Sequence, residues 1–258
     1  MIKIKIQLTG LVILLSLFFS LTSFDIPDEK KFIGREVKNI TILDSKGNNV
    51  QLFDNPTGKP VVLSPVYTRC PMACSLISNG LKTSIEKLGT LGKDFTVISF
   101  SFDSTDTQED LQGFEARWKM DGVNWKTVTS NAAGIDALLK SIDYQYEYDE
   151  KSKEYLHPNL VVVITPSGRI SRYIYGVEPK TIDLELAIME AQVEKTSLNN
   201  FFKTLYIRCF TFNPATKSYH LDWKFISQTS AGMMFIIIVG YFLIKSLYSK
   251  NTEDSAEL

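Results

Sequence analysis

Two long apolar runs, one near each end, limit where this chain can form a water-soluble domain. The first runs from Leu8 to Phe24 and follows Lys3 and Lys5, the order of charged and apolar residues found in a signal peptide or signal anchor. The second, Ala231 to Leu247, is uncharged until Lys245 and approaches the roughly 20 residues that cross a bilayer. We therefore expect an exported domain between the two runs.

Lysines beside the second run indicate its orientation. Lys245 and Lys250 favour the cytoplasmic side, so both termini would lie inside and the main domain on the exported (periplasmic or extracytoplasmic) side of the cell membrane. Ser20 and Thr22 match a cleavage site only loosely, which leaves both cleavage and a retained anchor open. The alternative for the second run is a buried core helix, but no amphipathic stripe interrupts it.

These patterns divide the chain into five parts. We expect a signal peptide or signal anchor over 1–25, a folded domain over 30–195, a juxtamembrane connector over 196–228, a transmembrane helix over 229–248 and a polar tail over 249–258. The 28 basic and 29 acidic residues nearly balance, and no basic stripe is visible, which argues against a nucleic-acid partner.

Within the domain, β-rich runs alternate with helical patterns, which indicates an α/β fold. A β-α-β half followed by a β-hairpin and a closing helix is the order of a thioredoxin-like fold, a central mixed sheet flanked by helices. The expected strands are Pro60 to Pro65, Phe95 to Phe102, and a hairpin of Leu160 to Thr165 with Arg169 to Tyr175; helices are expected around Leu76 to Leu88, around Leu111 to Trp118, and from Thr181 or Asp183 through Ala191.

Two cysteines four positions apart, Cys70 and Cys74 in YTRCPMAC, follow the first expected strand at its carboxyl end, where α/β folds build their sites. At the start of a helix this CxxxC spacing places both sulfurs on one face, one turn apart, so the pair can chelate a metal. A helix N-terminus also lowers the pKa of a thiol and supplies the thiolates that soft Cu(I) needs. Met72, between them, is expected to pack beside the site rather than to bind metal.

His157 is the candidate third ligand. It precedes Pro158 and the third strand, and in a thioredoxin-like fold the loop before that strand faces the cysteine loop. Two thiolates and one imidazole, with room for a weak further ligand, suit copper, whereas zinc usually takes a fourth strong ligand.

Several segments together resemble the Sco/SenC family of copper proteins, which assist assembly of the binuclear copper centre of respiratory cytochrome c oxidase. They are YTRCPMACSLISNGL, SFDSTDT, YEYDEKSKEYLHP, ITPSGRISRYIYG and, more weakly, RCFTFNPATKSYH, over roughly residues 35 to 220. The resemblance implies that Cys70 and Cys74 are thiolate ligands of Cu(I) or Cu(II), that His157 is the imidazole ligand, and that the partner is the copper-centre subunit of the oxidase. Asp103 matches an acidic position near the site, and we expect it behind the ligands or at a helix cap.

The chain departs from many relatives, which have CPxxCP and a serine after the histidine, because Ser75 and Pro158 stand there. This pattern is associated with a branch that carries a C-terminal extension. The three ligand positions are preserved, and the target of delivery is left open.

Two functions remain open. The first is a non-enzymatic metallochaperone that hands copper to an oxidase subunit. The second is a membrane-anchored thiol-disulfide oxidoreductase, with Cys70 attacking and Cys74 resolving, acting on copper-site cysteines of that subunit. His157 discriminates between them, because metal binding needs it and disulfide exchange does not. A structural disulfide between the pair would close a tiny loop and stabilise little, and SPVYTRC lacks the PxxxTxxC spacing of a peroxiredoxin.

Other candidate residues have simpler expected roles. Cys209 and His220, in the connector, are expected to pack near the membrane rather than to form a second metal or redox site. Asp106 and Thr107 are expected to cap a helix that begins near Glu109. A group of aromatic residues is expected in the core or on a docking face: Trp118, Trp125, Tyr144, Tyr146 and Tyr148.

Overall fold

The computed structural model describes residues 26 to 254, apart from 54–57, 71–72, 194–203 and 205. The N-terminal apolar run and the question of its cleavage lie outside the described residues.

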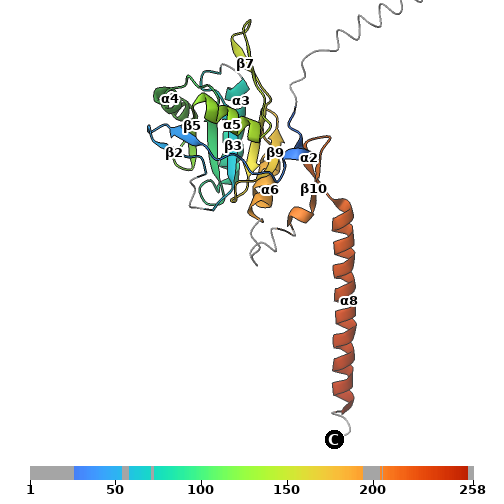
Figure 1. The fold of residues 1–258 in the computed structure, drawn as a ribbon. Coiled ribbons are helices and arrows are strands. Elements are labelled where there is room, and N and C mark those ends of the chain that lie inside the picture. The colour runs from blue at the N-terminus through green and yellow to red at the C-terminus, as the bar shows by residue number, and fades with distance from the viewer. Residues whose placement is uncertain (1–25, 54–57, 71–72, 194–203, 205, 255–258) are drawn as a thin grey trace, which may run out of the picture.

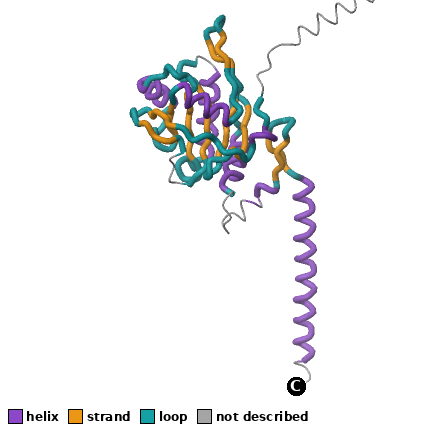
Figure 2. Tube along the Cα trace, in the orientation of Figure 1, coloured by secondary structure: helices purple, strands orange, loops and turns teal. Residues whose placement is uncertain are grey.

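A seven-stranded mixed sheet forms the centre of the domain (Figures 1 and 2). Its strands are β1 (Thr41–Asp44), β2 (Asn49–Gln51), β3 (Val61–Val66), β4 (Thr96–Ser101), β5 (Trp125–Thr129), β8 (Leu160–Ile164) and β9 (Ile170–Tyr175). The order across the sheet is β2-β1-β5-β4-β3-β8-β9. The strands β3, β4 and β5 run parallel, whereas β8 is antiparallel to both β3 and β9. Every residue of β3 and β8 is buried, as expected for central strands that are covered on both faces.

Helices cover both faces of this sheet. On one face, α3 (Ala73–Leu88) and α6 (Thr181–Gln192) pack their apolar residues against Val62, while on the other α5 (Ala132–Ser141) packs in the cluster that contains Leu63. Neighbouring residues of β3 thus point to opposite faces, as the period of two in a strand requires. A further helix, α4 (Gln108–Trp118), contributes Phe114 to the second cluster.

The predicted fold class, an α/β thioredoxin-like domain with a central mixed sheet flanked by helices, is confirmed. The expected runs form β3, β4, the β8–β9 hairpin, α3, α4 and α6 at nearly the predicted bounds. The sequence reasoning did not assign β5 or α5, which complete the sheet and its second face.

Two hairpins and a short helix, among the described residues, lie outside the sheet. The strands β6 (Glu147–Asp149) and β7 (Glu154–Leu156) form a hairpin that projects from one end of the domain (Figure 1). A four-residue helix, α2 (Glu29–Phe32), precedes the sheet. The predicted connector contains a second hairpin, β10 (Phe210–Asn213) with β11 (Ser218–Leu221), which contacts α6.

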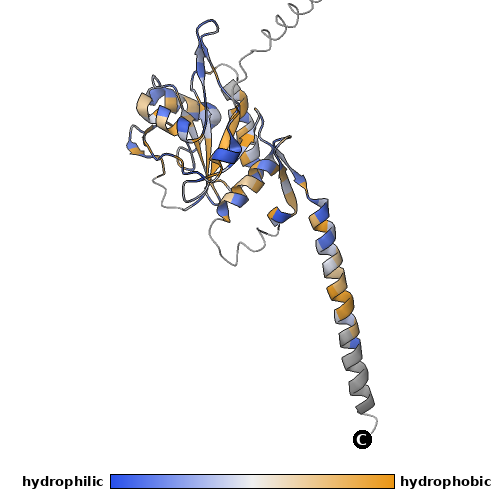
Figure 3. Ribbon diagram, turned by 45° about the vertical axis from the view of Figure 1, so that its right-hand side comes forward, coloured by the Kyte–Doolittle hydropathy of each residue, from blue (hydrophilic) through white to orange (hydrophobic). Residues whose placement is uncertain are grey.

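The last described element is one long helix, α8 (Trp223–Asp254), which extends away from the domain (Figure 3). Its segment Trp223–Phe242 is long and apolar enough to cross a membrane, and none of the most apolar stretch is buried against the protein. The helix continues through Lys250 to Asp254, over most of the part predicted as a polar tail.

Candidate metal site

Cys70 lies at the carboxyl end of β3, in the connection to α3. Its backbone N–H donates to the carbonyl of Tyr67 at 3.2 Å, which forms a turn, and only 5% of the residue is exposed. Cys74 lies in the first turn of α3, as the spacing predicted, but its side chain and the whole of Met72 are outside the described residues. The geometry between the two sulfurs is therefore not described.

A buried carboxylate, Asp106, holds the segment before Cys70 in place. It accepts hydrogen bonds from the Thr68 hydroxyl at 2.8 Å, from the Thr68 backbone N–H at 3.3 Å and from the hydroxyl of Ser101. Arg69 adds an ion pair at 3.3 Å. The prediction that Asp106 caps a helix is thus wrong, because its side chain faces the cysteine segment rather than the helix.

The cap of α4 is Thr107 instead. The helix begins at Gln108, and Thr107 and Asp110 exchange hydrogen bonds in a capping box. Backbone and hydroxyl donors of Thr107 hold the pKa of Asp110 below its ordinary value. The sequence therefore predicted the position of the cap correctly, and of the two residues proposed for it only Thr107 caps the helix.

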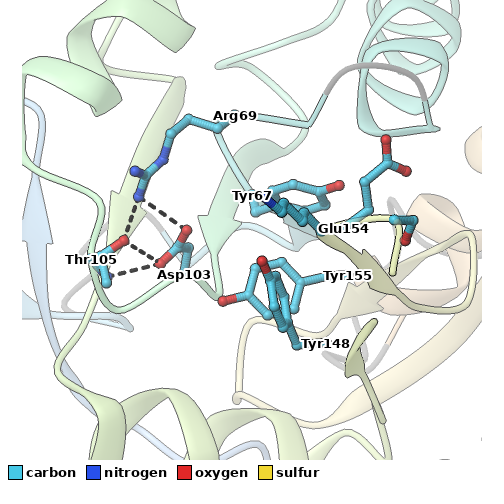
Figure 4. A pocket seen from close by; sticks show the side chains of 9 residues that line it. Tyr67, Arg69, Asp103, Thr105, Tyr148, Glu154 and Tyr155 are labelled. Carbon is cyan, nitrogen blue, oxygen red and sulfur yellow. Dashed lines mark hydrogen bonds and ion pairs between the residues drawn. The ribbon is translucent and has the colours of Figure 1, made fainter. Parts of the chain in front are cut away.

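Asp103, like Asp106, contacts the cysteine segment, and it is 8% exposed. Its carboxylate forms an ion pair with Arg69 at 3.1 Å and accepts from the backbone and hydroxyl of Thr105 at 2.9 and 2.7 Å (Figure 4). Asp103 therefore contacts Arg69, the neighbour of Cys70. It forms a network with Asp106 through this arginine.

His157 follows the end of β7 and is half buried among aromatic rings. Its ring centroid lies 5.5 Å from that of Phe102, 6.1 Å from that of Tyr67 and 6.3 Å from that of Tyr144, with the last pair stacked. Tyr67 and Cys70 belong to the same buried cluster. The fold therefore brings His157 beside the residue whose carbonyl closes the Cys70 turn.

Hydrogen bonds favour one tautomer of His157. The hydroxyl of Tyr144 donates to the carbonyl of Pro158 at 3.2 Å and lies 3.0 Å from Nδ1 of His157. Nδ1 itself lies 3.2 Å from the same carbonyl oxygen, which can only accept, so these contacts favour the tautomer that carries its hydrogen on Nδ1. The lone pair of the neutral ring is then on Nε2, the form in which a histidine held by such a partner binds metal.

A pocket of about 490 Å³ lies beside this cluster, on the side of the β6–β7 hairpin. Tyr67, Tyr148 and Tyr155 form one wall, and Arg69 with Asp103 the other (Figure 4). Burial, and then the charge of Asp103, raises the pKa of Tyr155, so its phenol is neutral at physiological pH. The pocket therefore lies between an aromatic wall and an ion-paired one.

Of the aromatic residues predicted for the core or a docking face, some are buried and others exposed, and Trp118 is partly buried against the core. Trp125 and Tyr144 are each 4% exposed, whereas Tyr146 and Tyr148 are 38% and 45% exposed. Sequence reasoning did not connect Tyr144 with His157, because the spacing of the two residues has no regular period.

Cys209 and His220 lie at the C-terminal hairpin, far along the chain from the site. His220, in β11, is exposed, and its Nε2 lies 2.9 Å from the hydroxyl of Thr216 and 3.1 Å from that of Ser218. Within the part of the chain that the structure describes, no three His, Cys, Asp or Glu side chains gather closely enough to hold a metal ion. The set of Cys70, Cys74 and His157 includes a side chain outside that part.

Comparisons with known proteins agree with the fold. The model of the SCO1/SenC family matches residues 31–189. A proposed electron transfer protein from Aquifex aeolicus VF5 is 42% identical and aligns with a TM-score of 0.59 over 62% of this chain and 94% of its own. No curated protein sequence matches the chain.

Two more distant structures share the fold. BsSco, described as a member of the Sco family of cytochrome c oxidase assembly proteins, is 23% identical, with a TM-score of 0.55 over 67% of this chain and all of its own (100%). ScoI from Arabidopsis thaliana, solved with copper bound, is 19% identical, with a TM-score of 0.51 over 60% of this chain and 96% of its own.

Proposed function

This chain belongs to the SCO1/SenC family, and we propose that it holds copper through Cys70, Cys74 and His157 and delivers it to the copper-centre subunit of a respiratory cytochrome c oxidase. Relatives in the family bind copper or are oxidase assembly proteins. The proposed location is the cell membrane, with α8 as the anchor and the domain on the exported side. In this role the chain is a metallochaperone without a turnover reaction of its own.

The observation that carries the proposal is the meeting of two distant segments at one aromatic cluster. Cys70 comes from the end of β3 and His157 from the connection between β7 and β8, yet both contact Tyr67. Cys74 follows in the first turn of α3. A soft thiolate pair and a neutral imidazole are a donor set that suits both Cu(I) and Cu(II).

The surrounding residues can perform two tasks for such a site. Tyr144 contacts Nδ1 of His157 at 3.0 Å and would leave Nε2 to bind the metal, a second layer of support that raises the affinity of many metal sites. Phe102 and Tyr67 exclude water from one side of the imidazole. Release then needs an acceptor whose own ligands replace those of this chain one by one.

A thiol-disulfide oxidoreductase is the second candidate, supported by the exported pair of thiols and by the disulfide switch for which BsSco is described. In that reaction the Cys70 thiolate attacks a partner disulfide and releases one partner thiolate. The Cys74 thiolate then attacks the Cys70 sulfur, which forms the Cys70–Cys74 disulfide and releases the second partner thiolate. An external dithiol reductant would restore the pair. His157 takes no part in these steps.

The test compares His157→Ala with the parent in both activities. Copper transfer is measured to an apo copper-centre domain of an oxidase subunit, and disulfide exchange is measured on the oxidised form of the same domain. We expect His157→Ala to lose copper transfer and to keep disulfide exchange. If the parent transfers no copper but reduces the domain, and His157→Ala does so equally well, the oxidoreductase replaces the chaperone.

A further inference from the structure

The C-terminal hairpin, β10–β11, lies beyond residues 31–189, which match the family, and it takes no part in the metal site. We propose that β10–β11 is a rigid mount that joins the domain to the membrane helix and holds the metal site at the end of the domain remote from the bilayer. The proposal rests on α8 as the membrane anchor, but it does not depend on which metal or partner the site serves.

The paired residues Phe212 and Tyr219, in the middle of the hairpin, pack against a partly buried ion pair of the domain. Arg172 of β9 bonds to Glu190 of α6 at 2.8 Å, and both side chains are only about one fifth exposed. The guanidinium of Arg172 also lies over the ring of Phe212 at 4.5 Å and near the ring of Tyr219 at 5.8 Å. One cation therefore connects the sheet, a helix and both strands of the hairpin.

A buried carboxylate fixes the middle of the hairpin. Asp183, in the first turn of α6, is 5% exposed and accepts a hydrogen bond from the backbone N–H of Tyr219 at 3.0 Å. A buried carboxylate on a backbone donor is costly to separate, because both groups would lose their partner. This contact sets the register of the hairpin against α6.

The tip of the hairpin reaches the start of the domain. Lys217 forms an ion pair with Glu29 of α2, and its ammonium lies 4.8 Å from the ring centre of Tyr175. The Tyr175 hydroxyl donates to the same carboxylate of Glu29 at 2.9 Å. The hairpin is therefore held at its middle, by Arg172 and Asp183, and at its tip, by Glu29.

The joint between the hairpin and α8 is a single residue, Asp222. Its carboxylate accepts from the backbone N–H of Phe225 at 3.0 Å and from the Thr211 hydroxyl at 3.1 Å, and its own N–H donates to the carbonyl of Cys209 at 2.8 Å. Asp222 thus caps the helix and bonds to the opposite strand at once. A flexible linker would need several residues without such bonds.

The direction of the mount follows from the strand register. Tyr175 pairs with Leu160, close to His157, so the hairpin tip lies toward the site end of β9. Arg172 pairs with Val163, toward the opposite end, and there it contacts Phe212, which lies further from the tip than Lys217. The helix α8 continues from the base and extends away from the site end (Figure 1). The six residues of β3 separate the two ends by about 20 Å.

This geometry limits the partner. A domain on a flexible tether could turn its site toward the membrane, whereas a mounted domain presents it only on the far side. With the proposed function, the acceptor that fits is a copper site on a domain that stands clear of the bilayer, rather than one within the membrane.

The first test measures the stiffness of the joint in the full chain in lipid nanodiscs. Nitroxide labels are attached at Lys140→Cys and Lys224→Cys, in a background of Cys70→Ser, Cys74→Ser and Cys209→Ser. Pulsed electron-paramagnetic-resonance distances should form one narrow peak. A short Gly-Ser insertion between Leu221 and Asp222 should broaden it severalfold, and the same insertion in the exposed turn between Lys151 and Ser152 should not.

The second test measures the direction of the mount. A fluorophore at Lys224→Cys should be quenched by lipids that carry a quencher on the headgroup, and one at Lys151→Cys, in the β6–β7 turn, should not. Three results would overturn the mount: a distance distribution in the parent as broad as with the joint insertion, equal quenching at both positions, or failure of the chain to enter nanodiscs. None of them affects copper stoichiometry, which tests the proposed function separately.

Discussion

Replacing Asp106 should destabilise the domain and loosen the segment that carries Cys70. Asp106→Ala leaves three buried donors, two on Thr68 and one on Ser101, without their acceptor. Each such donor costs about 1–3 kcal/mol, but hydroxyls can turn to new partners, so the total should be near the roughly 3–5 kcal/mol of a broken buried ion pair. Arg69 adds little, because 54% of its side chain is exposed and water can replace the carboxylate.

The assay is guanidinium unfolding of the detergent-solubilised chain, with copper retention against a chelator measured in parallel. Asp106→Asn keeps the shape and one acceptor oxygen, so it should lose about 1–3 kcal/mol. Asp136→Ala is the matched control, because its pair with Lys140 is exposed and is worth about 0.5 kcal/mol or less. If Asp106→Ala is no more destabilising than Asp136→Ala, or if copper retention is unchanged, the reasoning about this network is refuted.

Three further predictions concern separate parts of the domain. Gly80→Ala should lose about 1–3 kcal/mol, because the new Cβ would lie 2.8 Å from the Glu178 backbone, whereas Gly113→Ala, in open space on α4, should gain up to about 1 kcal/mol; equal thermal shifts would contradict this. Burial tends to raise the pKa of Asp121, but N–H donors, Trp125 first, bring it below its ordinary value, so its stabilising effect should vanish as pH falls below about 4. Asp121→Asn should therefore be less stable than the parent at pH 7 and approach it in acid, while a pH-independent difference in unfolding midpoint would count against the assignment. Tyr144→Phe should keep the fold but shift the Cu(II) absorption and electron-paramagnetic-resonance spectra, and spectra identical to those of the parent would exclude a positioning role.

The sequence was informative where local pattern decides structure. The buried strands β3 (VVLSPV) and β8 (LVVVI) are short, valine-rich runs bounded by turn signals, and they were predicted nearly to the residue. For the same reason Cys70 was placed correctly after β3 and Cys74 at the start of α3, because the strand and the helix were both clear.

Local sequence patterns could not predict contacts between residues that lie far apart in the chain. Asp106 followed by Thr107 has the composition of a helix cap, and only the fold shows that its carboxylate turns to Thr68, which lies 38 residues earlier. Tyr144 meets His157 because α5 and the β6–β7 hairpin bring their ends together, an arrangement without a fixed spacing. The β10–β11 hairpin had a usable signal, the alternation of Phe210 and Phe212 followed by Pro214, which the interpretation as a connector left aside.

The central claim is the three-ligand copper site, and copper stoichiometry with visible absorption of the purified chain tests it most directly. The parent should hold one copper ion per chain, with thiolate-to-Cu(II) charge-transfer bands that Cys70→Ser, Cys74→Ser and His157→Ala each abolish. A parent that binds no copper, or bands that survive any one of these substitutions, would contradict the account.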